Sequence, residues 1–310
     1  MSSGETRVGQ GIVLMLAALS CFAAMDTMVR YLGGAVPVLL LLILRYLTQA
    51  VLMAPVLAFG GHGFHSPRPG FQFVRGLLLL ACSAITFIGL RYMPVAEYTA
   101  IAMLTPVLVA VFSVVALKEP ISALRWALVV GAFAGALIVI RPGSGIFGWA
   151  VLWPLAGSCA YAAFQLVTSH YAPRENALVT HFWTGTVGAL AVLPAWPLGL
   201  VDVPGDWQAL PARAQWLVVW VGLLGTFGHL LLILAFRRAS ASRLTPFLYL
   251  QIAIAVLLGW AALGHVPDGW AWIGMAVIAA CGAGTAVLNL RAAAAARREL
   301  SAVVADTTAD

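Results

Sequence analysis

Ten apolar segments, each about twenty residues long, alternate with short polar turns along almost the whole chain. A helix needs about twenty apolar residues to cross a hydrocarbon core about 30 Å thick. In lipid the backbone must satisfy its own hydrogen bonds, so each segment is predicted to be a helix. The expected spans are residues 9–32, 36–59, 71–90, 95–117, 124–140, 148–168, 177–200, 215–236, 244–264 and 270–290.

The composition agrees with this pattern, because 62% of the residues are hydrophobic and only 9% are charged. Soluble domains have about 25% charged residues. We therefore predict an all-α polytopic membrane protein with no separate soluble domain. Residues 291–310 follow the last span and are predicted to form a disordered cytoplasmic tail, and the first span is predicted to be a retained signal anchor.

Basic residues predict the orientation, because lysine and arginine accumulate in cytoplasmic loops. Of the 17 basic residues, about twelve fall in one set of alternate loops and about four in the other, while Arg45 lies within a span. Both termini are therefore expected in the cytoplasm, and the protein in the cytoplasmic (inner) membrane. The net charge of +6 reflects this distribution, and no single basic face suggests a nucleic-acid partner.

The two halves of the chain repeat one another. Residues 11–24 match residues 149–162 in six identical positions, and the fourth and fifth spans match the ninth and tenth. The halves are thus residues 9–141 and residues 148–290. Each contains five spans, an odd number, so the second half is expected to enter the membrane inverted. Inverted repeats around a central cavity are typical of secondary transporters that work by alternating access.

Specific segments carry a family resemblance. They are residues 91–106 (RYMPVAEYTAIAMLTP), the Leu117-Lys118-Glu119 turn, the Arg141-Pro142-Gly143 turn, residues 248–251 (LYLQ) and Arg45. With these segments the chain resembles the EamA domain of the drug/metabolite transporter superfamily over nearly its whole length. The resemblance implies ten helices around a central cavity, cytoplasmic termini and small organic substrates. The chain departs from the family pattern at His265, where many members have an acidic residue, and at Ile252, where a proline often occurs.

Four charged residues lie in or near the outer parts of the predicted spans: Asp26, Arg30, Arg45 and Glu97. Charges at membrane depth are costly and are expected to pair or to line a wet cavity. We predict that these four form one cluster on the extracytoplasmic side. Such a cluster either pins adjacent helices together as a structural ion-pair network or takes part in substrate binding or gating.

Polar and aromatic residues on the sixth to ninth spans are further candidates for the cavity. His229 lies near the middle of the eighth span, where it would either carry a proton or bind substrate, or be a satisfied buried histidine. Together the candidates suggest an amphipathic ligand that is aromatic or zwitterionic. The other cavity candidates are Tyr161, Gln165, Trp183, Tyr249 and Gln251, with Trp153 beside them.

Prolines mark the predicted hinges. Pro106 lies inside the fourth span and Pro246 near the start of the ninth, and a proline inside a helix removes a hydrogen bond and bends the chain. Because the aligned positions differ, the two halves are expected to bend at different depths. The Gly131-x-x-x-Gly135 motif indicates close helix packing, and the protein is expected to be a monomer or a weak homodimer.

Other functional classes have little support in the sequence. It contains no HExxH, no aspartate-rich diphosphate motif and no phosphate-binding GxxxxGK, and its four cysteines form no CxxC pair. No catalytic residue, metal site or cofactor is therefore predicted. The expected function is secondary transport of a small organic metabolite, such as an amino acid, a vitamin, a nucleoside-like compound or a drug-like compound. The alternatives are a channel, a receptor or a membrane-embedded enzyme.

Overall fold

Every regular element in the described part of the chain is a helix. The computed structural model describes residues 3–61, 63–117, 123–142, 144, 146–171, 175–239 and 244–307. Seven helical segments in these ranges are long and apolar enough to cross a membrane, and three shorter apolar helices accompany them. The Lys118-Glu119 turn, Gly143 and Arg174 lie outside the described residues.

The helices follow the predicted spans closely. The first half contains α1 (Ser3–Leu32), α2 (Val38–Phe59), α3 (Pro69–Gly89), α4 (Val95–Ala102), α5 (Thr105–Leu117) and α6 (Ala123–Ile140). The second half contains η1 (Gly148–Val151), α7 (Leu152–Tyr171), α8 (Ala177–Val192), η3 (Leu193–Ala195), α9 (Val203–Ala209), α10 (Ala212–Arg238), η4 (Thr245–Tyr249), α12 (Leu250–Leu263) and α13 (Gly269–Thr307). The prediction of an all-α protein is confirmed.

Three elements differ from the predicted spans. The seventh span was expected to continue to residue 200, but α8 ends at Val192, where Pro194 in the next turn cannot donate a helical hydrogen bond. The short helix α9 was not predicted, because it falls in a polar connection. The tail was expected to be disordered, whereas α13 continues as a helix to Thr307. Five consecutive alanines at residues 292–296 explain this difference, since alanine has the highest helix propensity.

The fourth and ninth spans change their helical geometry at matching positions. The fourth is interrupted at Met103 and Leu104, between α4 and α5, and the ninth changes from a 3-10 helix to an α-helix between Tyr249 and Leu250. These positions are 146 residues apart, which is the spacing of the sequence repeat. The expectation that the halves bend at different depths stays a prediction. The interruption precedes Pro106, which occupies the first turn of α5, where a missing N–H costs nothing.

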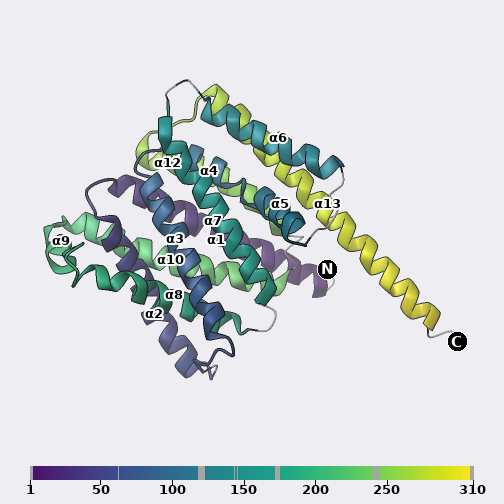
Figure 1. Ribbon diagram of the computed structural model, residues 1–310, viewed down its shortest axis with the longest axis horizontal. Helices are drawn as coiled ribbons and strands as arrows, with labels where there is room; N and C mark the ends of the chain where they lie inside the picture. Colours follow the sequence, from purple (N-terminus) through teal and green to yellow (C-terminus); the bar gives the residue numbers. More distant parts are fainter. Residues whose placement is uncertain are drawn as a thin grey trace.

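The packing of the helices follows a regular scheme (Figure 1). In the first set of contacts α1 packs against α10 and α12, and α2 packs against α10. In the second set α7 packs against α3, α4 and α5, and α8 packs against α3. The first span corresponds to the sixth, the second to the seventh, and so on through the two halves. When each span is exchanged for its counterpart in the other half, the first set of contacts becomes the second set. Three further contacts, α2 with α8, α4 with α12 and α6 with α13, join spans that are counterparts of each other.

The helices α6 and α13 lie side by side at one edge of the bundle (Figure 1). Their backbones approach closely at two glycines, because a Cβ added at Gly274 would lie 2.6 Å from the carbonyl oxygen of Gly135. A Cβ added at Gly131 would lie 2.7 Å from the sulfur of Cys281. The Gly131-x-x-x-Gly135 motif therefore packs α6 against α13 within the chain, as small residues do between membrane helices.

Candidate functional site

Buried polar side chains gather inside the bundle, where α2, α3, α8 and α10 pack together with α1 beside them. Polar and charged groups at membrane depth are costly, so a concentration of them marks either a structural network or a site of function. We call the following residues the central polar cluster: Asp26, Arg45, Gln49, Arg75, Ser83, His181, Thr184 and His229. Seven of these side chains are buried, and His229 is partly buried.

Arg45 on α2 is only 2% exposed and lies deep in this cluster. Its Nη1 donates a hydrogen bond to Oγ of Ser83 at 2.7 Å, and its guanidinium carbon lies 4.6 Å from the ring centre of Tyr46. The Ser83 hydroxyl donates to the Leu79 carbonyl at 2.9 Å, so its 2.8 Å contact with Tyr46 is donated by the tyrosine. The Nε of Arg45 is buried and has no hydrogen-bond partner among the described residues.

Arg75 on α3 is a second buried cation, 7% exposed. Its Nε donates to Oγ1 of Thr168 at 3.1 Å, and its Nη1 donates to Oγ1 of Thr184 and to the carbonyl of Thr180, the latter at 3.4 Å. The guanidinium also lies 4.7 Å from the ring centre of Phe164. Each of these partners is neutral, so dipoles and an aromatic face stabilise the charge of Arg75 without neutralising it.

Gln49 and two histidines connect α2, α8 and α10. Nε2 of Gln49 lies 2.9 Å from the carbonyl oxygen of His181 and 3.2 Å from Nδ1 of the same residue. A backbone carbonyl can only accept a hydrogen bond, so the Gln49 side-chain atom that faces it must be the amide nitrogen Nε2. The two hydrogens of this nitrogen serve both contacts. Nδ1 of His181 therefore accepts, and the proton of the neutral ring lies on Nε2, which is buried without a partner. The His181 ring stacks on that of His229 at 6.2 Å, and Nδ1 of His229 lies 2.9 Å from the Gly225 carbonyl.

The cluster contains more positive than negative charge. In the described ranges, neither Arg45 nor Arg75 has a carboxylate within 4.0 Å. Asp26 on α1 is close enough to Arg45 for their charges to interact, but its Oδ1 is buried without a partner. Both arginines also act electrostatically on His181 and His229. Two guanidinium groups and one carboxylate thus share the interior.

A second polar contact joins α4 to the connection between α12 and α13. Oε1 of Glu97 lies 2.8 Å from Nε2 of His265, and the glutamate side chain is only 4% exposed. Helix α12 ends at Leu263 and is followed by Gly264, whose φ of 67° favours glycine, and the amide of His265 donates to the carbonyl of Gly259 at 3.2 Å. This turn aims the imidazole at the start of α4.

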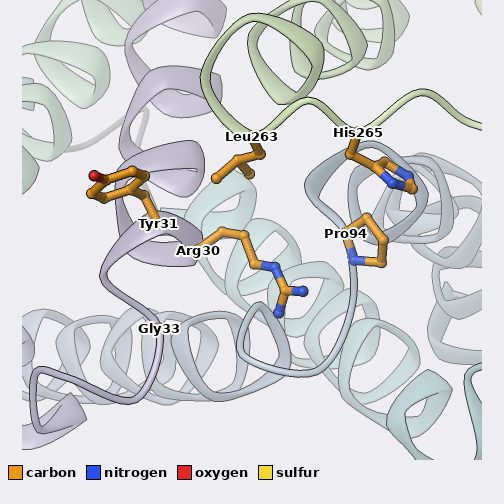
Figure 2. Close-up of a pocket in the computed structure, with 6 residues that line it drawn as sticks. All are labelled: Arg30, Tyr31, Gly33, Pro94, Leu263 and His265. Atoms are coloured by element: carbon orange, nitrogen blue, oxygen red, sulfur yellow. The ribbon is translucent and has the colours of Figure 1, made fainter.

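A cavity of about 510 Å³ opens at the same end of the bundle (Figure 2). Arg30 and Tyr31 come from the end of α1, and His265 and Pro94 lie across the cavity from Tyr31. Arg30 donates to the carbonyl oxygens of Leu90, at 3.0 Å, and of Arg91, the two residues that follow the end of α3. The cavity is lined by Arg30, Tyr31, Gly33, Pro94, Leu263 and His265.

The expected single cluster of Asp26, Arg30, Arg45 and Glu97 is not found. Among the described residues, none of these four is within 4.0 Å of another as an ion pair. Glu97 pairs with His265, and Arg30 donates to backbone carbonyls that follow the end of α3. Asp26 and Arg45 remain neighbours within the central polar cluster.

The other candidates are distributed over the bundle. Tyr161 stacks on Phe164 at 5.5 Å and lies within electrostatic range of both buried arginines, whereas no hydrogen bond is found for Gln165 in the described residues. Trp183 does not reach the cluster, because its indole N–H donates to the carbonyl of Phe64, 2.9 Å away in the loop between α2 and α3.

The two candidates on the ninth span also lie apart from the cluster. Tyr249 packs against Gly282 of α13, and its buried hydroxyl has no partner among the described residues. Gln251 is partly buried at the start of α12, without a hydrogen bond in the described ranges.

Sequence reasoning missed five members of the cluster, which are Gln49, Arg75, Ser83, His181 and Thr184. Arg75 lies inside the predicted third span, yet it was counted as a loop residue because it is close to the span's basic end. Gln49 and His181 are polar residues within apolar segments, and this was the signal that could have identified them. Among the described residues, no group of three or more His, Cys, Asp or Glu side chains is arranged to hold a metal ion.

Comparison with known proteins gives a consistent result. The riboflavin transporter of Vibrio cholerae is 25% identical over 87% of this chain and 90% of its own length. The S-adenosylmethionine uptake transporter of Rickettsia prowazekii is 24% identical over 83% of this chain and 86% of its own. A crystal structure of another protein, 20% identical, superposes with a TM-score of 0.63 and covers 93% of this chain and 98% of that one, which shows a common fold.

A sequence model of the EamA-like transporter family matches the chain twice, at residues 9–141 and 148–288. These two ranges comprise most of the chain, and the apolar helices described above account for a multi-pass membrane protein. The chain belongs to the EamA-like transporter family.

Proposed function

We propose that this protein is a secondary transporter that moves a small organic metabolite across the cytoplasmic membrane, with the central polar cluster as its substrate site. The observation that carries the proposal is the pair of buried arginines, Arg45 and Arg75, without a neutralising carboxylate inside the described apolar bundle. A structural network would be expected to neutralise such charges, whereas a site that receives a substrate leaves them available. Relatives named as riboflavin and S-adenosylmethionine uptake transporters support a small metabolite as the cargo.

We propose alternating access between two inverted halves, residues 9–141 and 148–290, as the mechanism. The helix contacts support it, because exchanging the halves converts one set of contacts into the other. The changes of helical geometry at matching positions of the fourth and ninth spans support it as well, since equivalent points of this kind would let each half bend in turn. We propose a monomer, because Gly131 and Gly135 of α6 pack against α13 of the same chain and so do not present their surface to a second copy.

The test is a counterflow assay with the purified chain in liposomes. Vesicles preloaded with an unlabelled compound should accumulate the labelled form when that compound is a substrate, and the initial panel is riboflavin, S-adenosylmethionine, nucleosides and amino acids. Saturable counterflow with at least one compound supports a carrier. A non-saturable flux would indicate a channel and product formation an enzyme, and either result contradicts the proposal.

Reporter fusions should place both termini in the cytoplasm. Fusions after Arg68 and after Arg298 are expected to give cytoplasmic activity, and a fusion after Gly205, in α9, external activity, because basic residues concentrate on the cytoplasmic side. Alkaline phosphatase and green fluorescent protein fused at the same positions report opposite sides and control for expression. Cytoplasmic fluorescence at Gly205 would contradict the five-plus-five arrangement.

The junction between α4 and α5 should act as a hinge. The Thr105 hydroxyl donates to the Ala102 carbonyl at 2.8 Å, and Pro106 has no N–H to offer that carbonyl. Pro106→Ala restores a donor and favours a continuous helix. We expect the variant to fold, to retain substrate affinity within about threefold and to slow counterflow by about tenfold or more, a barrier increase of about 1.4 kcal/mol.

Affinity and counterflow for this variant are measured on one purified preparation. Pro194→Ala is the matched control, because Pro194 lies in η3, away from the junction. Equal counterflow in Pro106→Ala and the unmodified chain would show that Pro106 has only a packing role.

A further inference from the structure

The cavity at the end of α1 is formed between the two halves of the chain (Figure 2). Arg30 and Tyr31 line it from the first half, and Leu263 and His265 line it from the second. Its volume of about 510 Å³ lies within the range of pockets that hold small organic ligands, about 300–1,000 Å³. A compound in this cavity would contact both halves at the end of the bundle that is predicted to be extracytoplasmic.

Arg30 presents its charge to this cavity. Its Nη1 donates both of the bonds to the carbonyls of Leu90 and Arg91, and these bonds hold the guanidinium in place. Figure 2 shows the guanidinium pointing into the space between Tyr31 and Pro94. Among the described residues, Nε and Nη2 of Arg30 make no hydrogen bond, and neither is a buried atom without a partner, so both can be reached by a ligand.

The nearest carboxylate of the lining region is occupied elsewhere. The Glu97 side chain is only 4% exposed, and its Oε1 contacts Nε2 of His265 at 2.8 Å. Arg30 has no carboxylate within 4.0 Å in the described ranges. An ionised carboxylate only accepts, so Nε2 of His265 donates to it, and Nδ1 of the neutral ring can accept from a ligand. The charge that the cavity offers to a ligand is therefore positive.

The remaining lining is aromatic and apolar. Tyr31 is 44% exposed, and the guanidinium carbon of Arg213 lies 5.1 Å from its ring centre, which adds a second positive charge close to the cavity. Leu263 and Pro94 supply apolar surface. A ligand that suits this lining has an apolar or aromatic body and one anionic group.

We propose, on the basis of the transport function above, that this cavity is a second binding site, which holds a small organic anion with an apolar or aromatic body at the outer mouth of the transport path. Arg30 binds the anionic group through Nε and Nη2, whose neighbouring N–H groups match two oxygens of a carboxylate, sulfonate or phosphate. Tyr31 and Leu263 contact the body of the ligand. This outer site is separate from the central polar cluster.

Two probes that differ in charge test the site on the purified full-length chain in nanodiscs. Naphthalene-2-sulfonate and naphthalene-2-sulfonamide share one ring system, and only the sulfonate is charged at neutral pH. Binding is measured by thermal stabilisation of the protein over a concentration series of each compound. We expect the sulfonate to bind about fivefold or more tightly, since a charge-assisted hydrogen bond in a partly buried site contributes more than an exposed ion pair.

Variants of two neighbouring arginines connect this preference to the cavity. Arg30→Gln should reduce the preference to about twofold or less, and Arg30→Lys should retain part of it because the charge remains. Arg91→Gln is the matched control, because it removes an equal charge at the same end of the bundle. Arg91 does not line the cavity, and its Nη2 donates to the Val36 carbonyl. An equal loss of preference in Arg30→Gln and Arg91→Gln would indicate a general positive field and overturn the proposal.

A cysteine in the lining locates the bound sulfonate without altering Arg30. Leu263→Cys is labelled with the anionic, membrane-impermeant reagent 2-sulfonatoethyl methanethiosulfonate, and the unmodified chain gives the background of its four native cysteines. Saturating sulfonate should slow the labelling of residue 263 by about fivefold or more, because an occupied site excludes the reagent. Gln208→Cys, at an exposed position of α9 outside the cavity, should be labelled at the same rate with and without the sulfonate.

Each result decides the proposal. Protection of Leu263→Cys by the sulfonate, with a preference that falls in Arg30→Gln, supports the site; if Arg30→Gln does not fold, Arg30→Lys and the protection decide. Equal binding of the two probes, or no protection at saturating sulfonate, overturns it. Protection without counterflow of any compound would reject the transport function and keep the binding site. Counterflow without protection would reject only the outer site.

Discussion

Arg45→Ala is expected to abolish most transport while the protein still folds. The side chain contributes a buried charge, the hydrogen bond to Ser83 and a contact with the Tyr46 ring. A charged hydrogen bond to a substrate is worth about 1.5–3 kcal/mol, so counterflow should fall by about 10- to 100-fold. Stability should change less, because removing a poorly neutralised buried charge offsets part of the packing lost on truncation.

The comparison variant is Arg213→Ala at the start of α10. Arg213 is exposed, and its guanidinium carbon lies 5.1 Å from the ring centre of Tyr31, a surface contact of small energetic value. Counterflow and melting temperature are measured for both variants in the same detergent and lipid. Equal, mild effects of the two substitutions would show that Arg45 neither contacts substrate nor supports the site.

Gly185→Ala should produce a large loss of stability. In α8 this glycine faces α2, and an added Cβ would lie 2.8 Å from the backbone nitrogen of Ala50 and 2.9 Å from Cγ of Gln49. A backbone atom cannot move aside as a side chain can, so the two helices would separate. Overpacking of this kind costs about 1–3 kcal/mol, and it should also lengthen the hydrogen bonds between Gln49 and His181.

Gly259→Ala is the matched control for this prediction. Gly259 lies inside α12, where an added Cβ meets no atom within 4 Å, so alanine should be neutral or stabilise the helix by about 0.5–1 kcal/mol. Thermal unfolding followed by intrinsic fluorescence measures both variants. An unchanged melting temperature for Gly185→Ala would contradict the close approach of α2 and α8.

Much of the fold was predictable because membrane helices depend on long apolar segments, which are explicit in the sequence. The bounds of α2, α3 and α6 agree with the predicted spans to within two residues, and α1 ends where predicted but begins six residues earlier. The hinge was predicted at the Leu104-Thr105-Pro106 block, and the interruption at Met103 and Leu104 overlaps that block; its bounds depend on the local hydrogen bonding of Thr105 and on packing against α7 and α12.

The candidate site was less predictable. Arg45 was identified because a charge in the middle of an apolar segment is conspicuous. The partners of Glu97 and Arg30 were wrong, since a single sequence does not show which of several helix ends meet in space. Arg75 was treated as a loop residue because hydropathy does not distinguish an arginine that faces lipid headgroups from one that enters the bundle between α7 and α8.

The close contact between α6 and α13 has a mechanical consequence. These helices come from different halves of the chain, yet at Gly135 and Gly274 their backbones leave no room for a side chain. Sliding one helix along the other would bring side chains next to these glycines into collision with the facing backbone. Relative motion of the halves is therefore expected to be a rotation about this edge, with the largest displacement on the far side of the bundle, at α2, α8 and α9. The α6–α13 pair would then lie on the rotation axis and move least.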